Sequence, residues 1–399
     1  MPGIESHASD LPLAMLLIFG AAKLLSEIFE YARQPGIVGE ILAGILIGPS
    51  VLGWVTPNEL ILALAELGVM FLLFRVGLEV KASEFLKVGG TAALVALLGV
   101  LVPFGCGWLL ARAWELSQIE SIFVGAAMVA TSVGITAQVL AAKGVLQVRA
   151  SRMILAAAVI DDVLGLIVLA VASSMAQGEV NFLSVALTAS LAIGFTILVA
   201  CWGTQAMSAI VPRLNEKLSS VESQFAIAIC LLFGLSLLAV YAGVAAIIGA
   251  FLAGMALAET VGRRVHDLTN GVCELLVPFF LVGIGLRFDL AAFSNRSTFL
   301  FAIVILIAAV ASKFIGCGLG AIKTGKADAI RIGIGMIPRG EVGMVVAQIG
   351  LAMAVISESI FGVVVFMSVM TTVIAPPLLN WAYRDVKAET SEEETFRIG

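Results

Sequence analysis

The feature that most constrains this chain is a series of apolar runs, each of roughly 18 to 28 residues, the length that crosses a bilayer as a helix. Glycine, proline and short charged clusters delimit thirteen spans, at about residues 11–30, 36–53, 58–78, 88–112, 119–143, 150–176, 181–210, 222–241, 243–259, 271–287, 296–320, 327–352 and 358–383. Only 13% of the residues are charged, against about a quarter in a soluble domain. The pattern predicts an all-α membrane protein with 13 transmembrane helices. It excludes a disordered chain, a nucleic-acid-binding protein and a secreted scaffold.

Most lysines and arginines fall on one side of the membrane if the amino terminus is placed outside. The segments then assigned to the cytoplasm contain 16 of the 23 basic residues: Arg33, Lys81, Lys87, Lys143, Arg149, Arg152, Arg213, Lys217, Arg263, Arg264, Lys323, Lys326, Arg331, Arg384, Lys387 and Arg397. The opposite side contains three, Arg112, Arg287 and Arg296. Because basic residues favour cytoplasmic loops, we expect the amino terminus outside and the carboxyl terminus inside, in the cytoplasmic (inner) membrane of a prokaryote.

The chain also repeats itself. The run GEILAG at 39–44 returns as GAFLAG at 249–254, an offset of 210 residues, and FLLFRVGL at 71–78 returns as FFLVGIGL at 279–286, an offset of 208. The repeat therefore relates the first six helices to the last six. With one linking helix between them, the second copy enters from the opposite side, so the sequence predicts two inverted six-helix repeats. This is a transporter architecture, whose binding site is expected at the repeat interface, between broken helices.

The fifth and twelfth spans contain signals for such breaks. The fifth contains the small and hydroxylic run TSVGIT at 131–136, and the twelfth contains MIPRGE at 336–341. Proline removes a backbone donor, and a charge pair at mid-membrane is costly unless it faces protein or water. We interpret both as discontinuous helices that cross, with Arg339 and Glu341 able to neutralise the partial charges of the half-helix ends. The alternative is a simple proline kink and a packing seam of small residues.

Two adjacent carboxylates lie deep in the sixth span. Asp161 follows Ser151, at the cytoplasmic end, by ten residues, which places it about 15 Å deep, near the middle of a core about 30 Å thick. Asp162 is next to it. Each carboxylate costs around 2.5 to 3.5 kcal/mol in this position, so such residues are functional by default. The alternative is a structural ion pair between helices.

A lysine lies at almost the same depth. Lys313 is ten residues from Lys323, at the cytoplasmic boundary of the eleventh span. Neighbours on a helix point about 100° apart, so one of the two aspartates can face Lys313 while the other faces an aqueous cavity. The formal charge of the three side chains is −1, which one monovalent cation or one proton cancels. Competition of Na⁺ and H⁺ for one carboxylate is all that a minimal antiporter requires.

Two further acidic residues correspond in the repeats. Glu66 and Glu274 lie in the third and tenth spans, 208 residues apart. Both lie nearer helix ends or packing faces than the aspartate doublet. We therefore interpret them as structural residues and not as carriers of an ion.

These motifs resemble a known family. The carrying segments are ATSVGITAQVL at 130–140, AAAVIDDVLGLIVLA at 156–170, ASKFIG around Lys313 and GMIPRGEVGMVVAQIG at 335–350. They are similar, in order and spacing over essentially the whole chain, to the NapA-type Na⁺/H⁺ antiporters of the monovalent cation:proton antiporter-2 family. The aspartate doublet with a lysine is fairly specific, since electroneutral relatives have Asn-Asp and Kef-like potassium systems have Gln-Asp at that place.

The resemblance implies a role for each matching residue. Asp162 would be the principal Na⁺-binding carboxylate, and Asp161 would pair with Lys313 and share in ion binding and proton carriage. Thr131 and Ser132 would lie at the helix break beside the ion. The arginine and glutamate of the PRGE run would stabilise the crossed breaks.

The resemblance also implies an NhaA/NapA-like fold, a homodimer and electrogenic exchange of two protons for one sodium ion, whereas the charge count above yields only one for one. The expected units are dimerisation-domain helices at 1–87 and 222–295, core helices at 88–180 and 296–383, a linker helix at 181–221 and a short disordered cytoplasmic tail at 384–399. No cofactor is expected, nor a nucleotide-binding regulatory domain of the Kef-like kind. The expected partners are the transported ions and the lipid bilayer.

Other functions remain open at this point. A K⁺/H⁺ antiporter uses the same architecture, and so does a sodium-coupled solute symporter, although no anchoring groups for a solute are evident. An intramembrane aspartyl protease also keeps two acids in the membrane, but on separate helices and within a G-x-G-D motif that this sequence lacks. A channel is disfavoured because no filter-like repeat is visible.

Overall fold

The structure is a computed structural model that describes residues 10–32, 34–80, 89–176, 190–199, 202–203, 205–207, 209, 221–288, 293 and 295–386. Its helices are α1 (Asp10–Tyr31), α2 (Gly36–Ile47), α3 (Glu59–Glu79), α5 (Gly89–Ala113), α6 (Gln118–Val129), α7 (Val133–Ala142), α8 (Arg149–Ala176), α10 (Val221–Tyr241), α11 (Ala246–Leu257), α12 (Arg263–Leu286), α13 (Arg296–Gly320), α14 (Lys326–Gly335), α15 (Gly340–Ala352) and α16 (Glu358–Ala382), with a 3₁₀ turn at Ile322–Thr324. No strand occurs in this described part of the chain, and nine of its helical segments are long and apolar enough to cross a membrane.

The predicted spans agree with these helices, with two main differences in length. α2 ends at Ile47, six residues before its predicted end at 53, because Gly48 and Pro49 cannot continue the helix. α12 begins at Arg263 rather than 271, because its first two turns are polar and an apolar run does not detect them. The predicted seventh span and tail lie largely outside the described residues, although 190–199 is helical.

Several helices begin at polar residues that satisfy the first backbone N–H groups. Ser117 forms a capping box with Glu120 at the start of α6, with hydrogen bonds of 3.0 and 3.2 Å. Asn58 accepts from the backbone of α3, and Ser357 from that of α16. These caps stabilise the first turn of each of the three helices.

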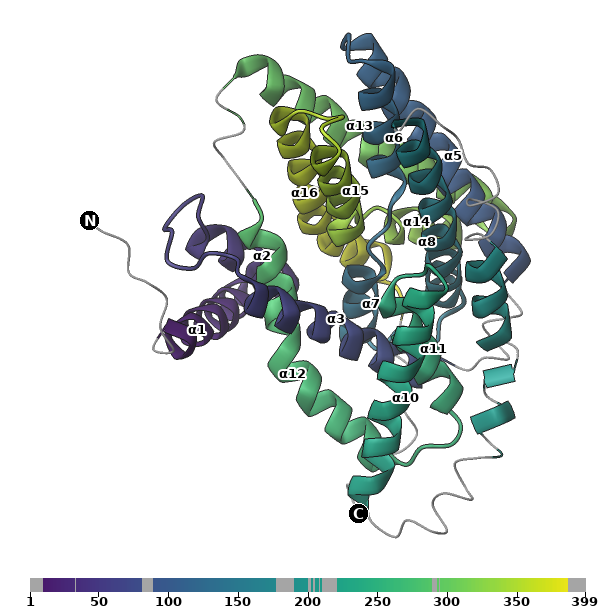
Figure 1. The fold of residues 1–399 in the computed structure, drawn as a ribbon. Coiled ribbons are helices and arrows are strands. Elements are labelled where there is room, and N and C mark those ends of the chain that lie inside the picture. Colours follow the sequence, from purple (N-terminus) through teal and green to yellow (C-terminus); the bar gives the residue numbers. More distant parts are fainter. Residues whose placement is uncertain are drawn as a thin grey trace.

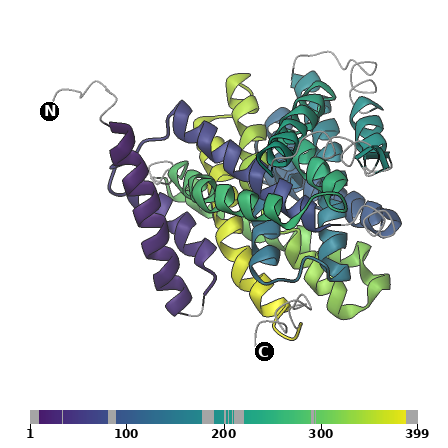
Figure 2. The same ribbon diagram turned by 90° about the horizontal axis from the view of Figure 1, so that it is seen from below.

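The helices pack in two groups. α5 packs along α6, α8 and α13, and α16 packs against α13, α14 and α15. In the other group, α3 packs along α11 and α12, α2 contacts α1 and α12, and α10 contacts α11. Figure 1 shows α1 at one edge of the molecule, with α5, α6, α8 and α13 gathered on the far side. α1 also lies at an edge in the perpendicular view of Figure 2.

Two helix crossings in the second group bring glycines from the repeated motifs together. A Cβ built on Gly44 would lie 3.0 Å from the Cα of Gly285, and one built on Gly77 would lie 3.0 Å from the Cα of Gly254. In both crossings the added carbon would also meet backbone atoms of the opposite helix. Gly44 corresponds to Gly254 in the sequence repeat, and Gly77 to Gly285. The α2 motif of the first repeat therefore packs on the α12 motif of the second, and the α3 motif of the first packs on the α11 motif of the second.

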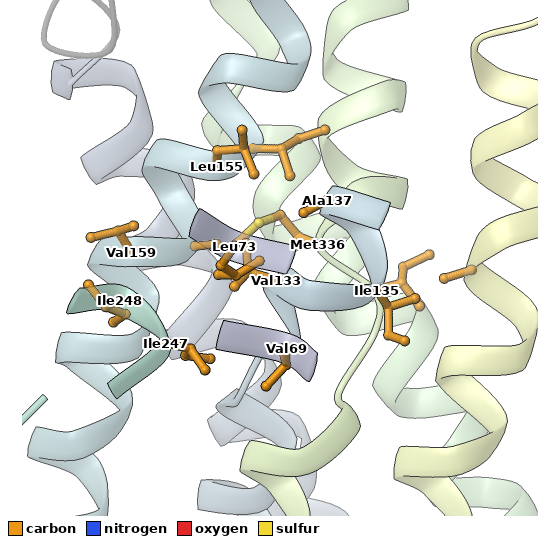
Figure 3. Close-up of a cluster of buried hydrophobic side chains, with 14 of the residues drawn as sticks. Val69, Leu73, Val133, Ile135, Ala137, Leu155, Val159, Ile247, Ile248 and Met336 are labelled. Carbon is orange, nitrogen blue, oxygen red and sulfur yellow. The ribbon is translucent and has the colours of Figure 1, made fainter. Parts of the chain in front are cut away.

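A cluster of buried apolar side chains joins the two helix groups. Figure 3 shows residues of α3 and α11 beside residues of α7 and α8 and the break that follows α14. The labelled members are Val69, Leu73, Val133, Ile135, Ala137, Leu155, Val159, Ile247, Ile248 and Met336. All are less than one-tenth exposed. The interface between the groups is therefore apolar at this level and excludes water.

Candidate ion-binding site

The site begins where two interrupted helices cross. α6 and α7 are separated by residues 130–132, and α14 and α15 by residues 336–339, so both helices are discontinuous where the sequence predicts it. The backbone N–H of Ser132 donates to the carbonyl of Pro338 at 2.7 Å, and the Thr136 hydroxyl donates to the carbonyl of Gly335 at 2.6 Å. Gly340 has φ +43°, and a Cβ there would lie 2.5 Å from the side chain of Ser132. The two breaks therefore touch, and a simple proline kink does not describe them.

Arg339 stabilises the carbonyl end of a half-helix at this crossing. Its side chain is completely buried, and its guanidinium donates to the carbonyl of Ala130 at 3.3 Å and to that of Ala309 at 2.8 Å. Its backbone N–H donates to the Thr371 hydroxyl at 3.2 Å. A cation at the carboxyl end of α6 opposes the partial negative charge there. Glu341 begins α15 with Gly340, but its side chain lies outside the described part of the structure.

Lys313 and Asp161 form a fully buried ion pair. The ammonium nitrogen lies 2.9 and 3.1 Å from the two carboxylate oxygens, and both side chains have zero exposure. The same nitrogen donates to the carbonyl of Val129 at 2.7 Å and to that of Gly99 at 2.8 Å. Lys313 thus uses its three protons on the carboxylate, α5 and the last turn of α6. The Gly99 contact could not be predicted from the sequence, because a glycine in an apolar helix has no distinctive pattern.

Asp162 faces differently from its neighbour. It is 7% exposed, and both aspartates belong to the wall of a cavity of about 720 Å³. α8 places the doublet at mid-helix, so the carboxylates diverge by the helical rotation between neighbours. Asp162 therefore lies beside the buried pair as a second carboxylate in the cavity wall.

The structure brings Thr131 and Ser132 to the crossing but not into the cavity wall. Both are at most 2% exposed, whereas the neighbouring Ala130 does line the cavity. The Thr131 hydroxyl is buried and has no hydrogen-bond partner in the described residues. Thr131 is thus next in sequence to a lining residue, but its own side chain is buried in protein.

The cavity lies between the two helix groups. One wall comes from α6, α8 and α15, and the other from α3, α12 and the α10–α11 connection. The second wall carries Glu59, Glu66 and Arg287, and most of the remaining lining is apolar. Glu66 is exposed to this space, so its expected role as a purely structural residue does not describe its position. Its facing direction depends on how α3 packs, which its sequence position does not reveal.

This geometry can hold one small cation or one proton. Carboxylate oxygens suit hard cations, and the Asp162 side chain, 7% exposed, belongs to the cavity wall. A bound Na⁺ and a bound proton satisfy the same carboxylate and therefore compete for it. The Asp161–Lys313 pair fixes the neighbouring charge, because removing either partner would leave the other buried and uncompensated.

Known proteins resemble this chain over nearly its full length. The profile of the family described as sodium/hydrogen exchanger, transmembrane, matches residues 14–383. The Na⁺/H⁺-K⁺ antiporter GerN of Bacillus cereus is 34% identical, over 92% of this chain and 95% of GerN. The high-affinity Na⁺/H⁺ antiporter NhaS3 of Synechocystis is 32% identical, over 96% of this chain and 92% of NhaS3.

The fold also matches a solved structure. The sodium proton antiporter MjNhaP1 of Methanocaldococcus jannaschii superimposes with a TM-score of 0.70 at 15% identity, over 97% of this chain and all of that one. That likeness shows the fold, while the profile and the relatives above 30% identity show the family. The aspartate, lysine and PRGE motifs predicted this relationship, and this helical, multi-pass membrane protein belongs to the sodium/hydrogen exchanger family.

Proposed function

We propose that this protein exchanges Na⁺ or Li⁺ for H⁺ across the membrane by alternating access. The observation that carries the proposal is the placement of Asp162 at the cavity, directly beside the buried Asp161–Lys313 pair. The antiporters GerN and NhaS3, at 34% and 32% identity, add support from sequence. In this proposal Asp162 binds the ion, and Asp161, Thr131 and Ser132 contribute to its environment. No cofactor takes part.

Alternating access requires two units that move against each other. We assign residues 88–180 and 296–383 to an ion-carrying core, 1–87 and 222–295 to a dimerisation domain, and 181–221 to a linker. The two helix groups and the apolar cluster between them support this division. The crossed glycine contacts of the repeated motifs support two inverted repeats, which are the usual basis of such a movement.

Exchange of two protons for one sodium ion needs a second titrating group. Asp162 supplies one proton site, and the second must come from the Asp161–Lys313 pair. Asp161 lines the same cavity as Asp162. A cation that enters the cavity and binds Asp161 would therefore compete with Lys313 for the Asp161 carboxylate. We propose that cation entry separates the pair and that Lys313 then releases its proton, which makes the exchange electrogenic.

We also propose a membrane location, an orientation and an oligomeric state. We propose that the amino terminus lies outside and the carboxyl terminus inside, which the distribution of basic residues supports, and that the membrane is the cytoplasmic membrane of a prokaryote. In that orientation, Glu59, Arg287 and the α10–α11 connection lie toward the outer face, and we propose that the cavity opens outward. The assembly proposed from the family resemblance is a homodimer.

A K⁺/H⁺ antiporter is the second candidate, because the name of GerN includes K⁺. Both ions are monovalent and hard, so a carboxylate site does not by itself select between them. Purified protein in proteoliposomes with an acidic interior separates the candidates. Na⁺ and Li⁺ are expected to restore the fluorescence of an internal pH dye, faster than K⁺, and valinomycin-set potentials should change the rate. Recovery by K⁺ alone would favour the second candidate, and recovery by no cation would refute antiport.

A further inference from the structure

The outer half of α3 presents two carboxylates to the cavity. Glu59 and Glu66 are seven residues apart, two helical turns, so they lie on one face of α3. Both line the cavity that contains Asp162, and both are exposed. Glu59 begins the helix, and Glu66 lies about 10 Å further along the axis. The two form a line of negative charge from the cavity mouth toward the ion site.

The same pair of carboxylates recurs in the second repeat. The offset of 208 residues that relates the α3 motif to the α12 motif carries Glu59 onto Asp267 and Glu66 onto Glu274. The acidic character and the seven-residue spacing are both kept. The crossed glycine contacts show that this offset also relates packing positions in three dimensions. The second pair is thus the counterpart of the first in space as well as in sequence.

The first half of α12 presents its pair on an exposed polar stripe. Arg263, Asp267, Asn270 and Glu274 follow one another at intervals of three or four residues, so they share a face, and all four are exposed. None of the four belongs to the lining of the cavity around Asp162. A polar stripe of this kind could line a water-filled cavity at the end of the molecule opposite the cavity around Asp162.

At that opposite end, described residues of the two helix groups contact each other. The guanidinium of Arg75, on α3, donates to the Gln138 side chain on α7 at 2.9 Å. The side-chain amide of Gln147, just beyond α7, donates to the backbone carbonyl of Glu79, at the end of α3. These contacts join the two helix groups beyond the apolar cluster. They must separate before any cavity forms on that side.

We propose that Glu66 and Glu274 are equivalent cation-collecting residues of the two faces, Glu66 serving the cavity seen here and Glu274 the cavity that opens on the opposite side. Glu59 and Asp267 mark the mouths of the two cavities. This inference rests on the proposed exchange function. Glu66 lies in a cleft with mostly apolar walls, where a carboxylate focuses the field and raises the local concentration of cations, and Glu274 would act in the same way once the opposite cavity opens. The effect acts on ion capture and not on the ion-binding carboxylate itself.

The test compares Glu66→Gln and Glu274→Gln at each membrane face. Uptake of radioactive Na⁺ is measured in acid-loaded right-side-out vesicles, which present the outer face, and in acid-loaded everted vesicles, which present the cytoplasmic face. Glu66→Gln should raise the KM for Na⁺ about 3- to 10-fold at the outer face only, with the maximal rate kept. Glu274→Gln should do so at the cytoplasmic face only. Added choline chloride should shrink both differences by screening.

Controls separate capture from surface charge and from folding. Glu358→Gln removes an exposed carboxylate at the start of α16, outside the cavity, and should leave both KM values unchanged. Glu66→Asp keeps the charge and should keep the wild-type KM. Equal effects of Glu66→Gln on both faces, or no effect on either, would overturn the inference while leaving antiport intact. Absence of Na⁺ uptake by the wild-type chain would instead overturn the proposed function.

Discussion

At the scale of single residues, Asp162 is the group on which the proposed exchange depends. Asparagine has nearly the same shape but no charge, so it can neither bind Na⁺ strongly nor carry a proton. We expect Asp162→Asn to abolish Na⁺-driven recovery of the pH dye in proteoliposomes, while the thermal unfolding temperature stays near or above that of the wild type. The substitution removes a charge from a side chain that is only 7% exposed, which explains the second expectation. Exchange that persists in this variant would remove Asp162 from its assigned role.

We expect Lys313 to contribute both to the stability of the protein and to the pH dependence of exchange. Lys313→Ala leaves the Asp161 carboxylate buried without its cation and removes the donor to Val129 and Gly99. Loss of one partner of a buried pair costs about 3 to 5 kcal/mol, so the unfolding temperature in detergent should fall markedly and the pH profile of exchange should shift.

The matched control for that substitution is Lys326→Ala, which removes an exposed lysine at the start of α14 and should leave the unfolding temperature unchanged. The double variant Asp161→Asn with Lys313→Met removes both buried charges and should recover part of the lost stability. If Lys313→Ala unfolds at the wild-type temperature and keeps the wild-type pH profile, the ion pair has neither of the two roles assigned to it.

At the scale of helices, the glycine crossings set how closely α3 and α11 approach. A Cβ on Gly254 would lie 2.9 Å from the backbone nitrogen of Leu78 and 3.0 Å from the Cα of Gly77. Gly254→Ala therefore forces the helices apart, and overpacking of this kind costs about 1 to 3 kcal/mol. We expect a lower unfolding temperature.

Gly234→Ala is the control, since it lies within α10 and an added Cβ would meet no atom within 4 Å. There the helix propensity of alanine should leave stability unchanged or raise it by about 0.5 to 1 kcal/mol. A Gly254→Ala variant as stable as Gly234→Ala would show that close approach at this crossing is not needed.

The helix features that could be predicted from the sequence are those that depend on neighbouring residues alone. Span positions follow from run length, and the two breaks follow from proline, glycine and buried charge, which are local features. Counting residues along each helix put Asp161 and Lys313 at one depth, and they pair. The direction in which a helix faces is not local. Glu66 faces the cavity, and Thr131 is turned away from it, because of how α3 and α6 pack against their neighbours.

At the scale of the whole molecule, the contacts between the two helix groups are unequal at the two ends. The cavity opens at one end of α3, while Arg75 and Gln138 join the groups near the other. An exchanger must close one entrance before the other opens, since a continuous path would let protons leak. Among the described residues, a cavity at one end of α3 and contacts between the helix groups near the other are what one of the two states of the proposed alternating-access cycle requires.

The membrane face to which the cavity opens can be used to test the proposed orientation of the chain. Ala63 lines the cavity and is exposed, whereas Ala327, near the start of α14, lies in a segment that the basic residues place in the cytoplasm. With the five native cysteines replaced by alanine, Ala63→Cys should react with a membrane-impermeant maleimide in intact cells and Ala327→Cys only in everted vesicles. Labelling at Ala63 should also block exchange, because the adduct fills the cavity above Asp162. The reverse pattern of labelling would place the amino terminus inside and turn the cavity toward the cytoplasm.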